Sequence, residues 1–423
     1  MQQFNFNYGS QTVALNLGGA AQVQTLAGYP PADITDIQAA LYAGLEHEMV
    51  NSSPLRQLVN QQDEVTIVIS DLTRLWQRQD LICTALVNYL LDTLGLPPQN
   101  VVVLVALGTH RPMQPAELAK VAGNAYNRVQ VLNHNCEAET AKVGTTSFGT
   151  EVKVNPLLVG RKVILVGGTV HHLMSGYGGG RKSIVPGVAA KSTVVQNHLR
   201  CLDERQPHSS SLIGPGKLAD NPVHLDMTEA AAFVNPVFGI NAIPGQNGPS
   251  GLVCGHWLGA WLTSCKLVNQ YFGVPIAQKA DIVIASCGGY PKDLNLYQAV
   301  KTLLNAGQAV KPGGTIVWLA QCEEGGGAPD FFDWIQPLRA GRLDAALRED
   351  FSIAGYIFYA SIEVIRRCGR VLLLTQIPAA ELDGMGIEVF NTVQGLQQAL
   401  QCTGKQVYIM PTGGNTVPYV SAK

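Results

Sequence analysis

The sequence has few charged residues and almost no net charge. Lys, Arg, Asp and Glu make up 14% of its 423 residues, and the formal net charge is −2 at pH 7. Proteins that bind nucleic acid or anionic membranes through electrostatics carry an excess of basic residues, so this composition argues against both partners. The sequence also lacks a run of about 18 apolar residues, which a membrane-spanning helix needs. We therefore expect no nucleic acid and no membrane as a partner.

The nine cysteines form no recognisable pattern. An odd number of cysteines without Cys-x-x-Cys pairs fits reduced thiols better than a disulfide framework or a structural zinc site. The first residues, Met1–Asn5, lack the basic and apolar regions of a secretory signal. The sequence therefore predicts a cytoplasmic protein.

The chain is instead rich in apolar sequence, with 46% hydrophobic residues. This length and composition predict a globular chain of two domains. Short β-branched runs alternate with helical patterns, which predicts an α/β fold with mainly parallel sheets flanked by helices. We expect an N-terminal domain at residues 1–268 and a C-terminal domain at 275–423.

Three buried strands are predicted in the first domain, at residues 64–70, 101–106 and 163–166. Each is followed by a loop with polar or ionisable side chains. In parallel α/β sheets, ligands bind beyond the carboxyl ends of the strands, so these side chains are expected to share one site. The side chains in this position are Asp71, Arg74, His110, His172 and Lys182. In the second domain, strands are predicted at 280–286, 314–320 and 370–374, with a helix at 296–304.

Residues 171–187, with the sequence HHLMSGYGGGRKSIVPG, are the densest glycine stretch with ionisable flanks. Dense glycine is costly in backbone entropy, so it indicates a backbone that approaches a ligand or adopts positive φ. Successive N–H groups in such a loop can surround an anion. The spacing is not that of a Walker loop. A surface loop without a ligand is the alternative, which the flanking His, Arg and Lys disfavour.

This stretch resembles the signature of the nickel-dependent lactate racemase family, in which a His precedes Gly-Gly-Arg-Lys and then Ile-x-Pro-Gly. In that family the Lys is joined covalently to a nickel pincer nucleotide, a modified pyridinium mononucleotide that holds nickel through sulfur and carbon. The resemblance implies that Lys182 carries this cofactor and that His198, on a predicted helix at 189–200, is the protein ligand to nickel. It further implies cofactor-binding roles for Asp71, Thr73, Gly179 and Gly180.

The resemblance extends over about residues 65–305, through Ser-Asp-x-Thr-Arg at 70–74 and Gly-Thr-His-Arg at 108–111. It implies that His110 and His172 are the acid/base residues. A second domain would complete the pocket, which would lie in the inter-domain cleft. The implied substrate-binding residues are Arg74, Tyr297, Gln298 and Lys301.

The sequence departs from the family's pattern at one position, and the resemblance does not assign a role to every residue. The Pro that follows the Arg in the family is replaced here by Leu75-Trp76. The aromatic wall of the family's pocket stays open between three residues, Tyr356, Phe358 and Tyr359. The resemblance gives no role to His171, and a structural role is expected for His47, His134, His208, His224 and His256.

Inverting the carbon of a 2-hydroxy acid requires its hydrogen to leave and to return on the other face. Loss of a proton beside a carboxylate is difficult, whereas hydride can leave as the hydroxyl gives up its proton. No common side chain accepts hydride, so a cofactor must do so. With the resemblance, this predicts a racemase or epimerase of a lactate-like 2-hydroxy acid, which acts by hydride transfer to the nickel pincer nucleotide.

The expected partners are the small-molecule substrate and the enzymes that make the cofactor. Two alternatives stay open. The first is the same chemistry on a sugar acid or another 2-hydroxy acid, such as malate or phenyllactate. The second is a non-catalytic protein that binds a phosphate ligand or the cofactor.

Overall fold

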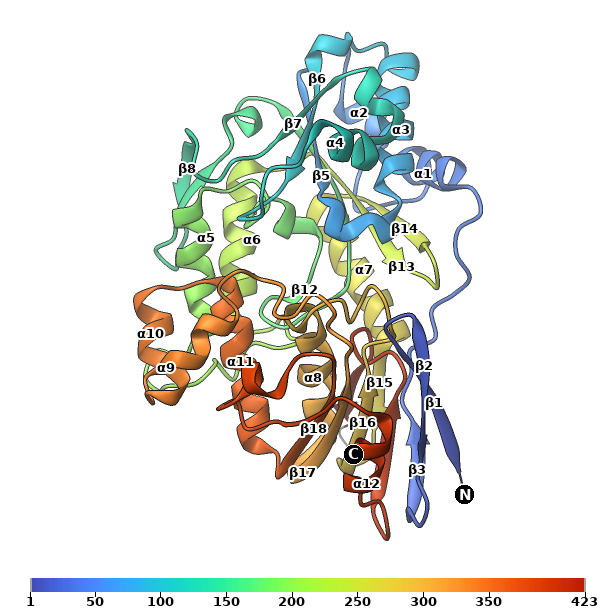
Figure 1. Ribbon diagram of the computed structural model, residues 1–423. Coiled ribbons are helices and arrows are strands. Elements are labelled where there is room, and N and C mark those ends of the chain that lie inside the picture. The colour runs from blue at the N-terminus through green and yellow to red at the C-terminus, as the bar shows by residue number, and fades with distance from the viewer. Residues whose placement is uncertain (1, 422–423) are drawn as a thin grey trace. The chain divides into compact units, whose positions relative to one another are not determined.

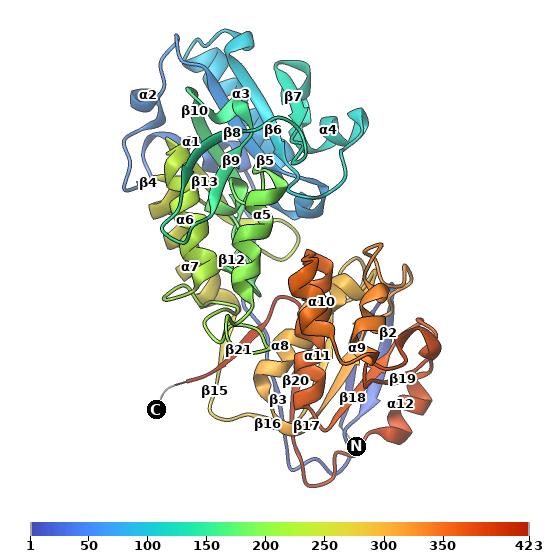
Figure 2. The same cartoon turned by 90° about the vertical axis from the view of Figure 1, so that its left-hand side faces the viewer.

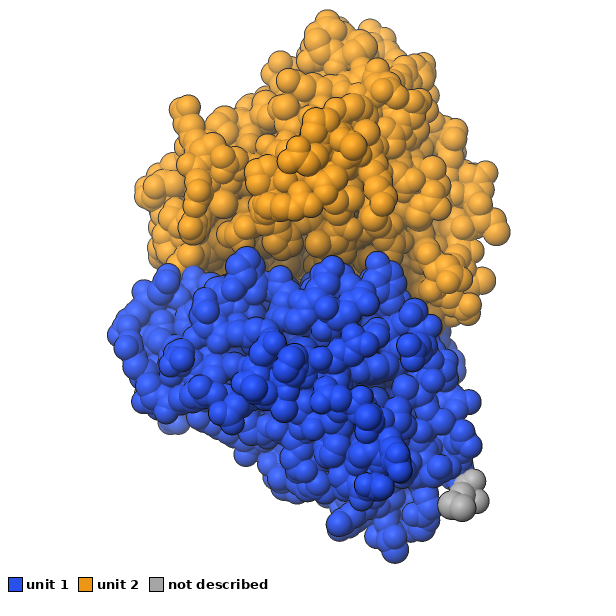
Figure 3. Space-filling model, in the orientation of Figure 1, with its two compact units in different colours: residues 1–29, 202–209, 272–423 blue, residues 30–201, 210–271 orange. Residues whose placement is uncertain are grey.

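The structure is a computed structural model that describes residues 2–421. The chain forms two compact units, coloured separately in Figure 3, and each is described by itself. Unit 2 comprises residues 30–201 and 210–271, and unit 1 the described parts of residues 1–29, 202–209 and 272–423.

Unit 2 is built around a seven-stranded sheet (Figure 1). The three strands predicted for this region are present, and Ile67 in the middle strand pairs with Val103 on one side and with Ile164 on the other, in parallel. All neighbours in the sheet are parallel except β13 and β14. The order across the sheet is β4 (Met49–Val50), β14 (Pro249–Gly255), β13 (Phe238–Pro244), β10 (Lys162–Gly168), β5 (Val65–Ser70), β6 (Val101–Ala106) and β7 (Gln130–Asn133).

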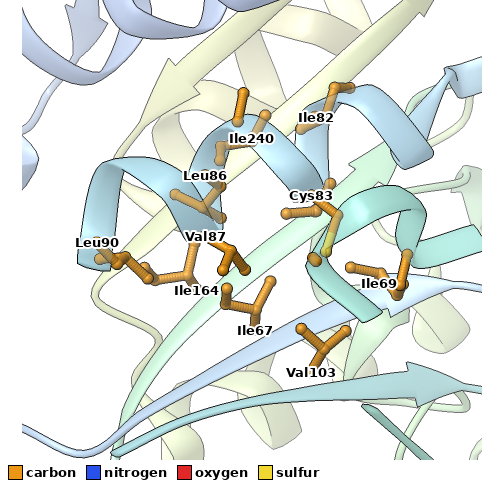
Figure 4. Close-up of a cluster of buried hydrophobic side chains, with 14 of the residues drawn as sticks. Ile67, Ile69, Ile82, Cys83, Leu86, Val87, Leu90, Val103, Ile164 and Ile240 are labelled. Atoms are coloured by element: carbon orange, nitrogen blue, oxygen red, sulfur yellow. The ribbon is translucent and has the colours of Figure 1, made fainter. Parts of the chain in front are cut away.

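Buried side chains from helices and strands form the core of unit 2. Figure 4 shows Leu86 and Val87 of one helix packed against Ile67 and Ile164 of the sheet. Because both faces of the central strands are covered, their sequences are continuous apolar runs rather than alternating ones. The helices of unit 2 are α1 (Ile37–Glu46), α2 (Leu55–Leu58), α3 (Gln79–Asn88), α4 (Pro115–Ala122), α5 (Lys191–His198), α6 (Pro222–Val234) and α7 (Trp257–Phe272). Two small antiparallel pairs complete it: β8 (Ala141–Thr145) with β9 (Glu151–Val154), and β11 (His171–His172) with β12 (Gly176–Tyr177).

Unit 1 contains a six-stranded, wholly parallel sheet, visible in Figure 2. The order across it is β19 (Glu388–Phe390), β18 (Arg370–Leu374), β17 (Val310–Leu319), β16 (Ala280–Ser286), β20 (Gln406–Met410) and β3 (Gln22–Thr25). The other elements of unit 1 are the pair β1 (Gln3–Tyr8) and β2 (Gln11–Asn16), the pair β15 (Gly273–Ile276) and β21 (Val417–Val420), and helices α8 (Leu296–Ala309), α9 (Ile335–Arg339), α10 (Leu343–Glu349), α11 (Ile353–Arg367) and α12 (Val393–Ala399). No helix within residues 2–421 is long and apolar enough to cross a membrane.

The predicted first domain, residues 1–268, differs from the structure at its start. Strand β3 pairs in parallel with β20, so that Val23 lies opposite Val407, and Phe6 and Leu15 are buried in the core of unit 1. The sequence did not predict this because β3 is a short and mostly exposed strand whose partner lies near the other end of the chain. The chain enters unit 1 briefly at residues 202–209 and leaves unit 2 for the last time at Tyr271, between the predicted end of the first domain and the start of the second.

Candidate active site

The predicted site residues of the first domain all lie in unit 2. They follow the carboxyl ends of three strands. Asp71 follows β5 and is the N-cap of a 3₁₀ turn, Leu72–Gln77. His110 follows β6, and His172 in β11 comes shortly after β10. Lys182 lies in a second 3₁₀ turn, Gly180–Ser183, and His198 ends α5.

Asp71 anchors the ring of His110. Its Oδ2 lies 2.5 Å from His110 Nδ1, and its Oδ1 accepts hydrogen bonds from the backbone N–H and the hydroxyl of Thr73. Burial alone would raise the pKa of the Asp71 carboxyl, but the hydrogen bonds from His110 and Thr73 outweigh burial and lower it. The carboxylate therefore stays ionised and keeps the proton of a neutral His110 ring on Nδ1. Nε2 of His110 is left with a lone pair that can accept a proton.

His172 is held in the opposite tautomer. Its Nδ1 accepts the backbone N–H groups of Met174 and Ser175 at 3.2 and 3.3 Å. A neutral imidazole that accepts at Nδ1 carries its proton on Nε2. That Nε2 lies 3.1 Å from the Nζ of Lys182, so the ring N–H points at a nitrogen that must supply a lone pair. The geometry thus favours an uncharged Lys182 amine.

The electrostatics of Lys182 agree with this geometry. Burial, followed by the positive charges of Arg181 and Arg74, lowers the pKa of the Lys182 amine well below its usual value. Arg74 donates to the carbonyl and the hydroxyl of Thr73 at 3.1 and 3.0 Å, and its charge also lowers the pKa of Asp71. Arg74 is therefore within electrostatic reach of both the Asp71–His110 pair and Lys182.

His198 is an uncharged, deeply buried imidazole with 1% of its surface exposed. Its Nδ1 donates to the carbonyl of Val194, at 3.0 Å, which leaves the lone pair on Nε2. Burial, the largest cause, lowers its pKa to about 3. A neutral imidazole with its lone pair on Nε2 is a good ligand for nickel. Within residues 2–421, no three His, Cys, Asp or Glu side chains form a metal site by themselves.

The glycines of the loop are required by close packing within unit 2. Gly179 has φ +71°, and a Cβ there would lie 2.8 Å from the carbonyl oxygen of Gly168. Gly180 has φ +53°, and a Cβ there would lie 2.5 Å from the Trp261 ring. A larger residue would be strained at either position. The packing explains these two glycines, and their predicted role in binding a cofactor stays a prediction.

The sequence did not identify the structural role of Arg181. This side chain is fully buried, and it donates to the carbonyls of Ser175 and Tyr177 at 2.6 and 2.9 Å. Its guanidinium lies 3.8 Å from the centre of the Trp261 ring. Arg181 therefore fixes the glycine-rich loop from inside. Only the partners reveal this role, and Trp261 belongs to a helix far along the chain from Arg181.

The predicted substrate-binding residues of the second domain lie on α8 of unit 1. Lys301 Nζ donates to Gln298 Oε1 at 2.6 Å, so the two residues share one helix face, as their spacing predicts. The Tyr297 ring meets the Phe331 ring edge-on. That these residues complete a pocket with Arg74 stays a prediction.

The three candidates for an aromatic wall are all buried within unit 1. Tyr356 donates to the Ser209 hydroxyl, Tyr359 donates to Asp344, and Phe358 packs edge-on against a neighbouring phenylalanine. The structure thus gives each a packing role and does not single one out.

His171, which had no assigned role, stacks on Tyr177. Burial lowers its pKa to about 4, so it is an uncharged structural residue. His134 has a structural role as expected, because its Nε2 lies 3.0 Å from the carbonyl of Ala189. His224 is also structural, since its Nδ1 accepts from Arg181.

Sequence comparison assigns the chain to a family. The sequence profile of the lactate racemase N-terminal domain matches residues 8–210, and that of the lactate racemase C-terminal domain matches residues 276–351. The chain belongs to the lactate racemase family. The two matched regions contain every predicted site residue, but the three candidates for the aromatic wall lie outside them.

Two lactate racemases are similar to this family member over part of their length. The protein of Thermoanaerobacterium thermosaccharolyticum is 32% identical over 295 residues, which is 68% of this chain and 66% of the relative. The protein of Lactiplantibacillus plantarum is 30% identical over 288 residues, 67% of this chain and 66% of the relative. The matched part of this chain thus spans slightly less than two thirds of each relative.

Solved structures confirm the α/β fold of this lactate racemase family member. The lactate racemase apoprotein of T. thermosaccharolyticum superimposes with a TM-score of 0.85 and 23% identity, over 99% of this chain and 100% of that chain. A protein of Thermotoga maritima gives a TM-score of 0.65 with 20% identity, over 94% of this chain and 100% of that chain.

Proposed function

We propose that this protein is a racemase of lactate or a closely related 2-hydroxy acid, and that it uses a nickel pincer nucleotide attached to Lys182. Family membership supports a racemase. The observation that supports the cofactor best is the electrostatic state of Lys182. A buried amine whose pKa is lowered, which is hydrogen-bonded to His172 and lies within electrostatic reach of His198, is prepared for covalent attachment beside a metal ligand.

The residues present fit such a cofactor. Attachment through an amine needs a lone pair on Nζ, and the lowered pKa of Lys182 provides it. Nickel needs a nitrogen ligand that stays unprotonated at neutral pH, and His198 does so with a pKa of about 3. The protein would supply a single imidazole, so the other metal ligands would belong to the cofactor. When bound, the cofactor would supply the electrophilic hydride acceptor that no side chain can provide.

The chain's own residues would manage the proton of the substrate hydroxyl. Asp71 Oδ2 accepts from Nδ1 of a neutral His110 ring, so Nε2 of that ring has the lone pair and can take the hydroxyl proton. His172 presents a protonated Nε2 and can donate to the oxygen of the keto acid. The two neutral rings are thus held as opposite tautomers. A racemase needs this pair, because the oxygen is deprotonated in one orientation and reprotonated in the other.

Positively charged side chains would orient the substrate by binding its carboxylate. The Arg74 guanidinium can grip a carboxylate through two parallel hydrogen bonds. Lys301 and Gln298 would add a charge and a hydrogen bond. This chain has Leu75-Trp76 where the family has a proline after the Arg. Trp76 packs against Gly168 at the end of β10. Because this change alters the surroundings of Arg74, larger acids belong among the test substrates.

Two measurements test the proposal. The first is intact-mass spectrometry after co-expression with the enzymes that make the cofactor. We expect a covalent adduct on the wild-type chain and none on Lys182→Ala. The second follows circular dichroism of single enantiomers of lactate, malate, phenyllactate and gluconate. His110→Ala and His172→Ala should lose turnover and keep their nickel. A wild-type chain that gains no adduct would refute the proposed cofactor and favour a non-catalytic binding protein.

A further inference from the structure

Helix α6 contacts the three segments that carry His172, Lys182 and His198. Its N-cap residue, Asn221, donates from Nδ2 to the carbonyl of Met174, at 2.9 Å, in the loop after His172. The Oδ1 of the same side chain accepts the N–H groups of Val223 and His224 at the start of the helix. The start of α6 is therefore tied to the backbone two residues beyond His172.

The second contact is made within the first turn of the helix. His224 Nδ1 accepts a hydrogen bond from Arg181 Nε at 3.1 Å. Burial, with the charge of Arg181, lowers the pKa of His224 to about 3, so the ring stays an acceptor. Arg181 is covalently next to Lys182. The rest of the Arg181 guanidinium is bound to two carbonyls and stacked on Trp261. The hydrogen bond to His224 therefore completes the set of contacts that fixes the segment carrying Lys182.

The third contact is a buried carboxylate. Asp226 is fully buried and accepts from Asn197 Nδ2 at 2.8 Å and from Arg200 Nε at 3.2 Å. These two residues lie on either side of His198. The hydroxyl of Thr150 donates to the same oxygen, Oδ2, at 2.8 Å, and the hydroxyl of Thr146 donates to Oδ1 at 2.5 Å. Figures 1 and 2 both show α5 and α6 side by side, next to the hairpin of β8 and β9 that carries this threonine turn.

We propose that the first two turns of α6, through Asn221, His224 and Asp226, are a positioning element that sets the location of His198 relative to Lys182. None of the three side chains is assigned contact with substrate or cofactor. Residues His224 and Asp226 are two positions apart, so they leave the helix in different directions and reach different segments. One short rigid helix thereby joins the amine side and the imidazole side of the proposed site. This inference uses the proposed function only for the roles of Lys182 and His198.

The first test uses cofactor-free protein and hydrogen–deuterium exchange read by mass spectrometry. In Asp226→Asn, backbone amides at residues 191–200 should exchange at least about tenfold faster than in the wild type, because α5 loses its anchor. Exchange in β5 should not change. Glu229→Gln is the matched control, since Glu229 lies on the same helix and binds Ser147 of the same hairpin, but not α5.

The second test uses holoenzyme from co-expression and separates the two sides of the site. Asp226→Asn should keep its adduct on Lys182 and lose nickel to a chelator about tenfold faster. Substitution of residues that orient metal ligands usually weakens metal binding by about this factor or more. His224→Leu should instead lower the fraction of chains with an adduct, and in the cofactor-free protein speed exchange at residues 175–185 while leaving 191–200 unchanged.

Several outcomes would overturn the inference. It is wrong if Asp226→Asn leaves exchange at 191–200 unchanged, or if Glu229→Gln raises it equally. If Asp226→Asn does not fold, Thr150→Val removes one donor to the same carboxylate, and unchanged exchange in that variant overturns the inference equally. Failure of the proposed function gives a different result. The wild type would then gain no adduct, and the exchange experiment on cofactor-free protein would still decide whether α6 positions α5.

Discussion

In cofactor-free protein at pH 7, Lys182 should react with a small acylating reagent in preference to exposed lysines. A solvated lysine with pKa ~10.4 has only about one amine in 2,500 unprotonated at pH 7. Burial and the charges of Arg181 and Arg74 lower the pKa of Lys182, and each unit of lowering raises its free-amine fraction about tenfold until that form dominates. A less basic amine is a weaker nucleophile, and Lys182 is only partly exposed, so both effects reduce the gain. We expect a net preference of about tenfold over Lys120, which is exposed on α4.

The assay is brief labelling with an N-hydroxysuccinimide acetate, followed by peptide mass mapping at several pH values. The preference for Lys182 should be greatest near pH 7 and should shrink toward pH 10, where exposed lysines also lose their protons. Simple accessibility would favour Lys120 at every pH. If Lys182 is labelled no faster than Lys120 at pH 7, or if the ratio does not fall as the pH rises, the amine is not held uncharged and our interpretation of its geometry is wrong.

Four substitutions give further expected outcomes. Lys182→Met should raise the free energy of unfolding at pH 7 by on the order of 1–3 kcal/mol, and with it the melting temperature, because the folded state no longer has to keep an amine deprotonated. This gain should vanish near pH 10.5, where the amine of the unfolded chain also loses its proton. Asp71→Asn should lower kcat by about 10²- to 10⁴-fold at unchanged nickel content, measured by racemisation and metal analysis, since the His110 tautomer is no longer fixed. His198→Gln should keep the mass adduct and lose nickel. Arg181→Met should destabilise the protein by about 3 kcal/mol in urea denaturation, because buried carbonyls lose their donors.

Each of these has a result that contradicts it. A lower melting temperature for Lys182→Met at pH 7 would mean that the amine is charged in the folded protein. Loss of nickel in Asp71→Asn would indicate that the carboxylate supports the metal site rather than the acid/base residue. Nickel retained by His198→Gln would remove that imidazole as the ligand. For Arg181→Met the control is Arg78→Met, whose exposed pair with Asp80 should change stability by less than about 1 kcal/mol.

Much of unit 2 was predictable because its signals are local. Parallel strands buried on both faces must be continuous apolar runs, and residues that follow them must gather at one edge of the sheet. The strand pattern alone therefore predicts that Asp71, His110 and Lys182 lie at one edge. The shared face of Gln298 and Lys301 was equally predictable, because three residues make nearly one helical turn.

The N-terminal strand and the interior of the glycine-rich loop were not predictable, because their partners are distant in sequence. A four-residue strand such as β3 has no strong pattern of its own, and only its pairing with β20 assigns it to unit 1. The sequence around Gly180 indicates a residue for ligand approach, yet its immediate neighbour is Trp261. Sequence spacing carries no information about which distant side chain fills such a contact.

The sequence by itself determined the α/β fold class, the family and the set of ionisable side chains at the strand ends, since all of these depend on local patterns and motifs. Only the tertiary structure decided which ring nitrogens of His110 and His172 are held by neighbouring groups, and that the pKa of Lys182 is lowered. Whether Lys182 is charged depends on burial, on the Nε2–H of His172 and on nearby guanidinium groups, and these come from segments that folding brings together. The chain thus supplies the residues, and their surroundings in the folded protein set their chemistry.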